Sequence, residues 1–468
     1  MLSACAGSIS DTPLIAGTPP RQPAPAPLPV SQPRSAEFQK LIETYGGEYN
    51  NNKMATEVQS LIGRLVEASD QPNRSVNLTI LNSPAINAFA LPSGDLFLTR
   101  GLITLANDES ELAAVIAHEL AHVTADHARL RQRQARAAAL AQRVSDVVDD
   151  PAIKLETRET AEVSLASFSQ RQELQADEIG VRTLAKAGFD PYAAARFLGS
   201  MARYAALPAF NAASSPSPGF LSSHPSTPSR VANARRVARG FSAPGVGITG
   251  RDRYLEHLDG ALFGDDPRQG YVRAREFAHV TLGIAFEVPK GYVLKNTSAA
   301  VLATDGQHTA IRFDAVAVPP RQDLADYLRS GWVKGLISDS VRETTVDGQE
   351  TATASALVDG WSFRIGVIRG NQRVYRFIFA SSKPASAYED AFRRTLASFR
   401  LLTPADRARM RPLTIRIVTV RPGDTVASLS QRMDGVDPDV KRPLFETLNG
   451  LGNETDLKAG MKVKLVVE

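Results

Sequence analysis

The sequence has almost no cysteine, no long apolar run and little net charge. One cysteine, Cys5, occurs among its 468 residues, which excludes an internal disulfide and any cysteine-based zinc site. No segment approaches the roughly 18 uninterrupted apolar residues that a membrane-spanning helix needs. The formal net charge is only +4, and no long block of Lys and Arg appears, so nucleic acid is a poor candidate for a partner.

The composition is that of a globular protein with several domains. Hydrophobic residues make up 43% of the chain and charged residues 22%. A chain of 468 residues is too long for one ordinary core, so about two to four domains are expected. Changes in composition place the domains at residues 36–265, 271–402 and 412–468, after an N-terminal segment of residues 1–35.

Residues 1–35 are predicted to be a tether rather than part of a core. The first eight residues, MLSACAGS, resemble a bacterial lipobox, in which the cysteine is lipidated, although the charged and apolar segment that should precede it is missing. From Asp11 to Arg34 there are eight prolines in 24 residues, which favours an extended spacer. We therefore expect a lipid on Cys5 to hold the folded body near a membrane. The alternative is an unmodified cysteine in a floppy tail.

Hydrophobic spacing predicts helices and then a small sheet. Residues 36–69 carry Leu, Ile and Val at helical spacing, whereas residues 76–83 and 94–102 have the short apolar pattern of strands. Asn107 and Asp108, followed by two glutamates, mark the start of the next helix.

That helix carries a His-Glu-x-x-His pattern within AVIAHELAHVTADHA, residues 114–128. Four-residue spacing places His118 and His122 on one helical face, one turn apart, where their ring nitrogens can converge on a tetrahedral zinc ion. Glu119 then points toward the open coordination site, where it can take a proton from water at the metal and deliver it to a leaving amine. The alternative is that both histidines lie in a core or at the surface without a metal.

A catalytic zinc needs a third protein ligand, and a glutamate on a second helix is the better candidate. In RQELQADEIG, residues 171–180, Glu173 and Asp177 share one helical face. Glu173 can complete a His-His-Glu site, and Asp177 can accept the spare N–H of a liganding histidine. Taken alone, the same two residues would fit an ordinary exposed helix face.

His127, the third histidine of the stretch, is not expected to be a ligand. An elongated pattern with a third histidine would need glycine at position 125 and histidine at position 128, and both are alanine. His127 lies about 140° round the helix from His122. We therefore interpret His127 as a supporting or structural residue.

Four motifs occur in a specific order: NAFALP at residues 87–92, AHELAHV on the histidine helix, ELQAD at 173–177, and SHP at 223–225 followed by Arg230. They resemble one family of zinc metalloproteases, which includes the CAAX prenyl proteases, the HtpX-type and Oma-type quality-control proteases, and the BepA-type proteases of bacterial envelopes. The resemblance covers about residues 36–240. The absence of membrane spans places the chain with the periplasmic, BepA-like branch.

The resemblance implies an α+β protein whose first domain is a mainly helical, gluzincin-type metalloprotease with a small sheet. It implies one zinc ion per chain. His118, His122 and Glu173 carry over as the zinc ligands, and Glu119 carries over as the general base and acid.

The resemblance also implies a substrate-binding strand. The strand around Phe89, Ala90 and Leu91 would be the edge beside the cleft, on which an extended substrate adds as a further strand. Backbone pairing of this kind holds an unfolded peptide with little regard for its sequence.

His224 lies in LSSHPSTPSR, where two prolines stiffen a loop, and an equivalent histidine lies near the active site in the family. Two roles stay open: His224 stabilises the oxyanion together with Arg230, or it occupies the fourth zinc position as a reversible latch. A surface histidine is the third interpretation.

Residues 271–402 are predicted to form an α+β domain with a binding or spacer role. Alternating apolar and polar residues predict strands, two of which form a hairpin at Gly370-Asn371, and a helix is expected over residues 385–399. The pattern is weakly similar to PsbP and Mog-type folds. It contains no cluster of catalytic residue types, so pure scaffolding fits equally well.

The last segment carries PGDT at residues 422–425, LNGL at 448–451 and DLKAGMKVKL near its end. These motifs make residues 412–468 resemble the LysM module, a β-α-α-β unit that binds N-acetylglucosamine chains in peptidoglycan or chitin. Val420 stands where that module often has an aromatic residue. Peptidoglycan binding and a mere packing role are therefore both open.

Together these features predict a zinc-dependent endopeptidase of the bacterial periplasm, anchored at the outer membrane, that degrades unfolded or misassembled envelope proteins. The alternative is a cell-wall-associated protein that binds or remodels peptidoglycan. Glu119 argues for a catalytic zinc, because structural zinc sites are closed and need no base. The strand-pairing edge implied by NAFALP argues for protein substrates over short branched peptides.

Overall fold

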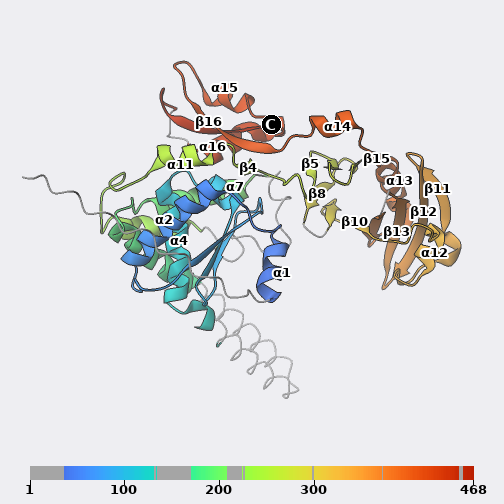
Figure 1. The fold of residues 1–468 in the computed structure, drawn as a ribbon, viewed down its shortest axis with the longest axis horizontal. Helices are drawn as coiled ribbons and strands as arrows, with labels where there is room; N and C mark the ends of the chain where they lie inside the picture. The colour runs from blue at the N-terminus through green and yellow to red at the C-terminus, as the bar shows by residue number, and fades with distance from the viewer. Residues whose placement is uncertain are drawn as a thin grey trace, which may run out of the picture.

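The computed structural model describes residues 36–130, 133, 170–207, 224, 227–297, 300–370, 373–452 and 457–468. Cys5 and the proline-rich segment lie outside the described residues. Within these ranges, no helix has both the length and the apolar character needed to cross a membrane. Figure 1 shows a mainly helical body beside a sheet-rich body, so the fold class is α+β, as predicted.

A small three-stranded sheet precedes the histidine helix. Its order is β1-β3-β2, with β1 parallel and β2 antiparallel to β3, so β2 is an edge strand. The two predicted strands are confirmed, but the prediction that the second continues to residue 102 is wrong. Thr99 ends it because its hydroxyl accepts a hydrogen bond from the N–H of Leu102 and starts a short helix. The elements are α1 (Ala36–Thr44), α2 (Asn52–Ala68), β1 (Asn77–Leu81), β2 (Ala88–Ala90), β3 (Asp95–Thr99) and α3 (Arg100–Leu105).

Both faces of this sheet are covered. Successive residues of β3 face opposite sides, so Leu96 and Leu98 join the main core while Phe97 packs on Phe38 of α1. Phe89 of the edge strand stacks on Phe97, with ring centroids 4.8 Å apart. Figure 1 shows α1 across the sheet from the other helices. The edge strand is therefore held by aromatic packing from one side.

The histidine helix, α4 (Glu109–Thr124), runs through the middle of the helical body. Asp108 caps it as predicted, because its Oδ1 accepts a hydrogen bond from the N–H of Glu111 at 2.8 Å. Every residue from Glu109 to His122 is buried, so the helix is enclosed on all sides. It packs against α2, β2 and α7 (Ala193–Ala205).

A second helix runs through residues 170–186 and carries the predicted acidic pair. It ends at Gly188: this glycine has a φ of 79°, and the N–H of Phe189 donates to the carbonyl of Leu184 at 3.0 Å. The helices α10 (Pro228–Ala238) and α11 (Arg251–Leu258) complete this body.

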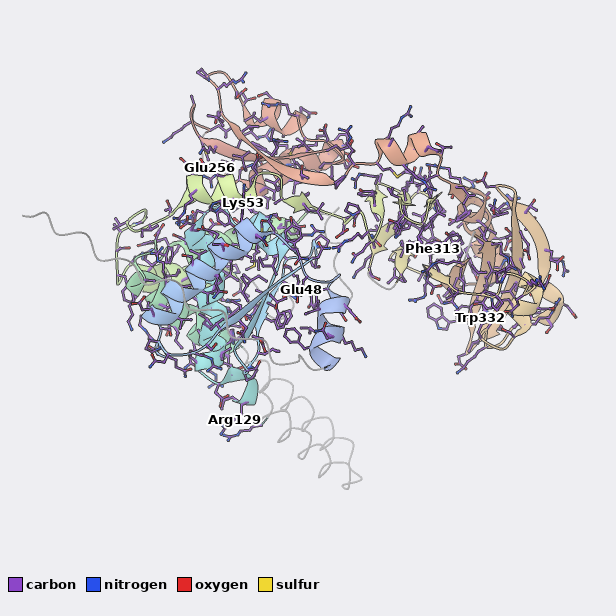
Figure 2. All side chains as sticks on the ribbon, viewed as in Figure 1. Glu48, Lys53, Arg129, Glu256, Phe313 and Trp332 are labelled. Carbon is purple, nitrogen blue, oxygen red and sulfur yellow. The ribbon has the colours of Figure 1, made fainter. Side chains whose placement is uncertain are left out.

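The middle of the chain forms two antiparallel sheets with cores of their own, and Phe313 lies within this part (Figure 2). The orders are β11-β12-β13-β14-β10-β9-β8 and β15-β7-β6-β5. Antiparallel pairing of β13 with β14 confirms the predicted hairpin, but the last strand pair is Arg369 with Val374, so the connection is longer than the predicted Gly370-Asn371 turn, of which Asn371 lies outside the described residues. The predicted helix is shorter because residues 385–387 form a separate 3-10 turn. The elements are β5 (Tyr271–Arg273), β6 (Glu276–His279), β7 (Ile284–Glu287), β8 (Val293–Asn296), β9 (Val301–Thr304), β10 (Thr309–Val316), α12 (Leu324–Arg329), η1 (Ser338–Ser340), β11 (Arg342–Val346), β12 (Gln349–Val358), β13 (Trp361–Arg369), β14 (Val374–Ser381), η2 (Ala385–Ala387), α13 (Glu389–Ala397), β15 (Arg400–Leu401) and α14 (Pro404–Arg409).

The C-terminal part returns to the helical body, where Figure 1 shows it over α11. Strand β16 pairs with β17 and also with β4, which precedes the middle part. Buried residues of this part belong to the same hydrophobic core as those of α2, α4 and α7. The described residues of 412–468, which are predicted to form a unit of their own, therefore pack against the helical body. The elements are β4 (Leu262–Phe263), β16 (Leu413–Thr419), α15 (Val426–Gln431), α16 (Pro438–Leu448) and β17 (Lys462–Val467).

Arg100 connects the start of α3 to the segment around β4, and its replacement should destabilise the fold. Its buried guanidinium donates to Oδ1 of Asn82 at 2.8 Å and to the carbonyls of Leu262 and Gly264. In Arg100→Met these acceptors lose their donor, so the free energy of unfolding should fall by about 3 kcal/mol or more in urea unfolding. Arg329→Met removes an exposed cation whose partner, Asp326, is also exposed, and should cost less than about 1 kcal/mol. Equal losses in both variants would contradict this account.

Candidate metal centre

Two buried helices bring the predicted ligands together. Helix α4 carries His118 and His122, and the helix at residues 170–186 carries Glu173. The two helices meet at Gly180, where an added Cβ would lie 3.2 Å from the backbone nitrogen of His118. The absence of a side chain at this position therefore permits the close approach on which the site depends.

Four buried side chains direct donor atoms to one point. The ligand atoms of His118, His122, Glu173 and His224 all lie within 4.8 Å of one another. The Nε2 atoms of His118 and His122 are 3.1 Å apart, and each is 3.4 Å from an oxygen of Glu173. Tetrahedral ligands at the usual zinc distances lie about 3.3 Å from each other. The donor types and these separations fit zinc, and Oε1 of Glu173 accepts no hydrogen bond from the described residues.

His224 lies on the fourth side of the cluster. Its Nδ1 is 2.9 Å from Oε2 of Glu173 and 3.3 Å from Nε2 of His118. Its Nε2 is 3.7 Å from Oε1 of Glu119. Since His224 is only 6% exposed, the interpretation as a surface histidine is wrong.

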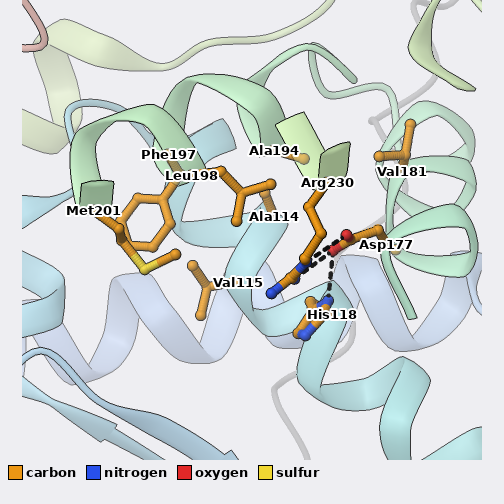
Figure 3. A pocket seen from close by; sticks show the side chains of 11 residues that line it. Ala114, Val115, His118, Asp177, Val181, Ala194, Phe197, Leu198, Met201 and Arg230 are labelled. Atoms are coloured by element: carbon orange, nitrogen blue, oxygen red, sulfur yellow. Dashed lines mark hydrogen bonds and ion pairs between the residues drawn. The ribbon is translucent and has the colours of Figure 1, made fainter. Parts of the chain in front are cut away.

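Asp177 lies beside His118 and Arg230, and its carboxylate contacts both of them (Figure 3). The Nδ1 of His118 is 3.0 Å from Oδ1 of Asp177. Arg230 donates from Nε and Nη2 to the two oxygens of Asp177 at 2.8 and 2.7 Å, and its Nη1 is 3.1 Å from Oε2 of Glu173. Three nitrogens of this arginine therefore contact the two carboxylates that touch the histidines.

A small, mostly apolar cavity adjoins this ion pair. Val115 of α4 and Leu198 and Met201 of α7 line it, with His118 and Arg230 at its polar end (Figure 3). Apolar surroundings lower the local dielectric and strengthen the attraction between Arg230 and its carboxylates.

His127 packs on the side of His122 that faces away from the cluster. The two Nδ1 atoms are 2.9 Å apart, and Gln175 and Gln172 hold His127 through its Nε2 and its carbonyl at 3.2 and 3.0 Å. Asp126, with a φ of 54°, turns the chain back after α4. The contact between the Nδ1 atoms orients the ring of His122 so that its Nε2 faces the cluster.

Glu119 lies between α4 and the edge strand β2. The backbone of Ala90 in β2 forms a hydrogen bond with its carboxylate. Burial raises the pKa of Glu119, although His224 and His118 oppose part of this shift. A raised pKa suits a group that accepts and returns a proton near neutral pH.

Two candidate ligands, His122 and Glu173, are held in the forms that bind metal, whereas His118 is not: burial alone would lower the pKa of His118, but hydrogen bonds with Asp177 and Glu173 raise it to about 9. Burial lowers the pKa of His122, which favours the neutral imidazole. Burial alone would raise the pKa of Glu173, but hydrogen bonds with His118 and His224 outweigh it and hold this pKa below its usual range. The pKa of Asp177 is lowered in the same way by Arg230 and His118, against burial.

Sequence reasoning missed three residues of this centre. Gly180 interrupts a helical pattern, and an isolated glycine there is a sign of close packing that was available from the sequence. Gln172 and Gln175 could not be identified from the sequence, because a polar residue on a helix gives the same sequence pattern whether it faces water or a buried histidine.

The range of the chain that carries this cluster matches a known family. Residues 52–238 match the sequence profile described as Peptidase family M48. This M48 region contains both helices and all four side chains of the cluster, and it confirms the predicted family.

Several curated relatives share this region. The "Beta-barrel assembly-enhancing protease" of Escherichia coli (strain K12) is 32% identical over 219 residues, which are 44% of this chain and 43% of that protein. The "Mitochondrial metalloendopeptidase OMA1" of Schizosaccharomyces pombe (strain 972 / ATCC 24843) is 30% identical over 182 residues, or 37% of this chain and 50% of that protein. The match thus spans about half or less of each relative.

Two solved structures align with part of the chain at low sequence identity. Cyanobacterial PsbP from Synechocystis sp. PCC 6803 aligns with 30% of this chain at 14% identity, with a TM-score of 0.23. A protein of Bacteroides thetaiotaomicron VPI-5482 aligns with 42% of this chain at 12% identity, with a TM-score of 0.25. TM-scores this low assign no fold.

Replacing Gly180 should disturb the metal centre more than the fold. In Gly180→Ala the new methyl group must move the two helices apart, because the backbone of His118 lies 3.2 Å from it. We expect zinc affinity, measured by competition with a chelator, to fall about tenfold. Gly63→Ala in α2 is the matched control, since no atom lies within 4 Å of its added Cβ. It should add about 0.5–1 kcal/mol of stability without changing zinc affinity. Equal zinc affinities in the two variants would refute this role of Gly180.

Proposed function

We propose that the protein is a zinc-dependent endopeptidase that hydrolyses peptide bonds of unfolded or misassembled envelope proteins. The observation that carries the proposal is the buried cluster of His118, His122 and Glu173 with Glu119 beside it. A zinc site with three protein ligands and an adjacent carboxylate is the arrangement of a catalytic centre, whereas a structural zinc site needs no base.

The zinc ion and the protein side chains would have separate roles in the reaction. Zinc held by His118, His122 and Glu173 would supply a Lewis acid that lowers the pKa of water. Glu119 takes the proton of the attacking water and delivers it to the leaving amine. Asp177 and Arg230 act as positioning residues: Asp177 orients His118, and Arg230 holds both carboxylates.

The edge strand favours extended protein substrates. Strand β2, with Phe89 and Ala90, is at the edge of its sheet, Ala90 contacts Glu119, and Leu91 follows the strand directly. An unfolded segment that pairs with this edge would bring its backbone to the metal centre with little dependence on side chains. The name of the relatives, beta-barrel assembly-enhancing protease, supports envelope proteins as the substrate class.

The proposed place of action is the bacterial periplasm. The lipobox-like start supports a lipid on Cys5 that anchors the protein at the outer membrane. The LysM-like motifs of residues 412–468 support a contact with peptidoglycan. These two motifs also support the second candidate function, a cell-wall protein that binds or remodels peptidoglycan, but Glu119 and the edge strand favour proteolysis.

Removing the proposed base should separate metal binding from cleavage. In Glu119→Gln we expect zinc, measured by elemental analysis, to be retained, while cleavage of an unfolded protein falls at least about a hundredfold. Glu178→Gln, on an exposed face of the second helix, should behave as wild type. If the wild type cleaves no better than Glu119→Gln and instead releases stem peptides from peptidoglycan, the second candidate function replaces the first.

His224 is proposed to be the fourth zinc ligand, a reversible latch that keeps the resting enzyme slow. Its Nδ1 lies within the ligand cluster, which supports the latch over a contact with the oxyanion. His224→Ala should therefore retain zinc and cleave an unfolded protein several-fold faster, because the fourth position opens to water. His308→Ala, an exposed histidine of the middle part, serves as the control. Lost cleavage with zinc retained would instead support the oxyanion role.

A further inference from the structure

A buried lysine from the C-terminal strand lies at the end of α3. Lys464 has no exposed surface, and its Nζ donates to the carbonyls of Thr104, Leu105 and Ala106 at 2.9, 3.2 and 2.8 Å. An ammonium group has three N–H donors and no acceptor, so these three bonds use all of its donors. The lysine is therefore an internal cap and not a surface charge.

The three carbonyls belong to the last turn of α3 and its C-cap, where a helix has no partners of its own for them. Only Asn107 and Asp108 follow before α4 begins at Glu109. The bond partners of Lys464 thus lie on the short connection that leads into the helix of the metal centre.

The C-terminal part holds Lys464 firmly in place. The backbone N–H of Lys464 donates to Oδ1 of Asn449 at 2.7 Å, and Nδ2 of Asn449 donates to the backbone carbonyl of Lys464 at 3.0 Å. Gly450, which follows Asn449, lies against the connection between α3 and α4: a Cβ added at Gly450 would be 3.1 Å from Nδ2 of Asn107. The turn after α16 and strand β17 therefore contact the connection together.

The connection between α3 and α4 is also hydrogen-bonded to α4. The N–H of Asn107 donates to Oε2 of Glu111 at 2.9 Å, and Arg251 donates to the carbonyls of Asn107 and Lys462 at 2.9 and 3.3 Å. Asp108 closes the first turn of α4 through Glu111. A movement of residues 104–106 would be passed to α4, because only Asn107 and Asp108 separate them and both are hydrogen-bonded to Glu111 of α4.

We propose that Lys464 is a positioning residue for the metal centre. By capping α3 it fixes the start of α4, and residues 413–467 work as a built-in part of the peptidase unit although they lie outside the M48 match at 52–238. Without the ammonium group, three buried carbonyls would lack a donor, and the connection would rearrange to find others. Helix α4 would move with it and displace His118 and His122 relative to Glu173.

The test compares two lysines of the full-length, zinc-loaded protein. Lys464→Met keeps the apolar stem and removes the ammonium group, and Lys458→Met does the same at an exposed lysine of the same segment. Well below the unfolding temperature, we expect kcat on an unfolded protein to fall about tenfold in Lys464→Met with little change in KM. The rate at which a chelator removes zinc should also rise in Lys464→Met. Lys464→Arg, which keeps donors, should recover part of both losses, and Lys458→Met should match wild type.

A purely stabilising role gives a different result. If Lys464→Met lowers the unfolding temperature but keeps the kcat and zinc release of wild type, the positioning proposal is overturned. The effect on kcat rests on the proposed peptidase function, but zinc release does not. If the wild type cleaves nothing, that function fails, and zinc release alone decides the role of Lys464.

A second variant covers the case in which Lys464→Met does not fold. Gly450→Ala keeps the ammonium group and presses a methyl group toward Asn107. Faster zinc release in this variant supports coupling between the C-terminal part and the metal centre. Release at the wild-type rate overturns it.

Discussion

Buried contacts of the carboxylates of Asp177 and Glu173 connect the elements that form the centre. Oδ1 of Asp177 contacts both His118 and Arg230, and Arg230 also contacts Glu173. All four groups are buried, so each charge needs the others, and loss of one would leave an uncompensated charge in an apolar setting. The three elements that supply these groups can therefore pack closely only in an arrangement that also brings the candidate ligands together.

The complete burial of α4 extends this dependence to the whole helical body. The second helix packs against the middle of α4 at Gly180, and hydrogen bonds around Asp108 fix the start of α4. Lys464 reaches that start from the C-terminal strand. A helix that contributes two histidines and a base to one site is thus held at several points by segments far apart in the chain. Such enclosure limits motion of the ligands and excludes water from the groups behind them.

Much of the fold and the centre of the site could be predicted because the relevant patterns are local. Helical periodicity and the Asp108 cap predicted the helices correctly, and alternation predicted β1, β3 and the β13–β14 hairpin. The strand predicted to run to residue 102 ended at Thr99, since a side-chain cap at one residue outweighed the apolar pattern. The packing of the C-terminal part on α3 had no local pattern: Lys464 lies in a strand with buried residues on both faces.

The placement of His118, Glu119 and His122 on one turn of a helix follows from the sequence, because four-residue spacing and the helical period are properties of a single segment. The meeting of Glu173, His224 and Arg230 with these residues, and the bonds of a lysine more than three hundred residues away near the start of that helix, come from the packing of the folded chain. The physical reason is that these contacts depend on how separate elements pack and on which buried charges compensate one another. No local spacing along the chain encodes either.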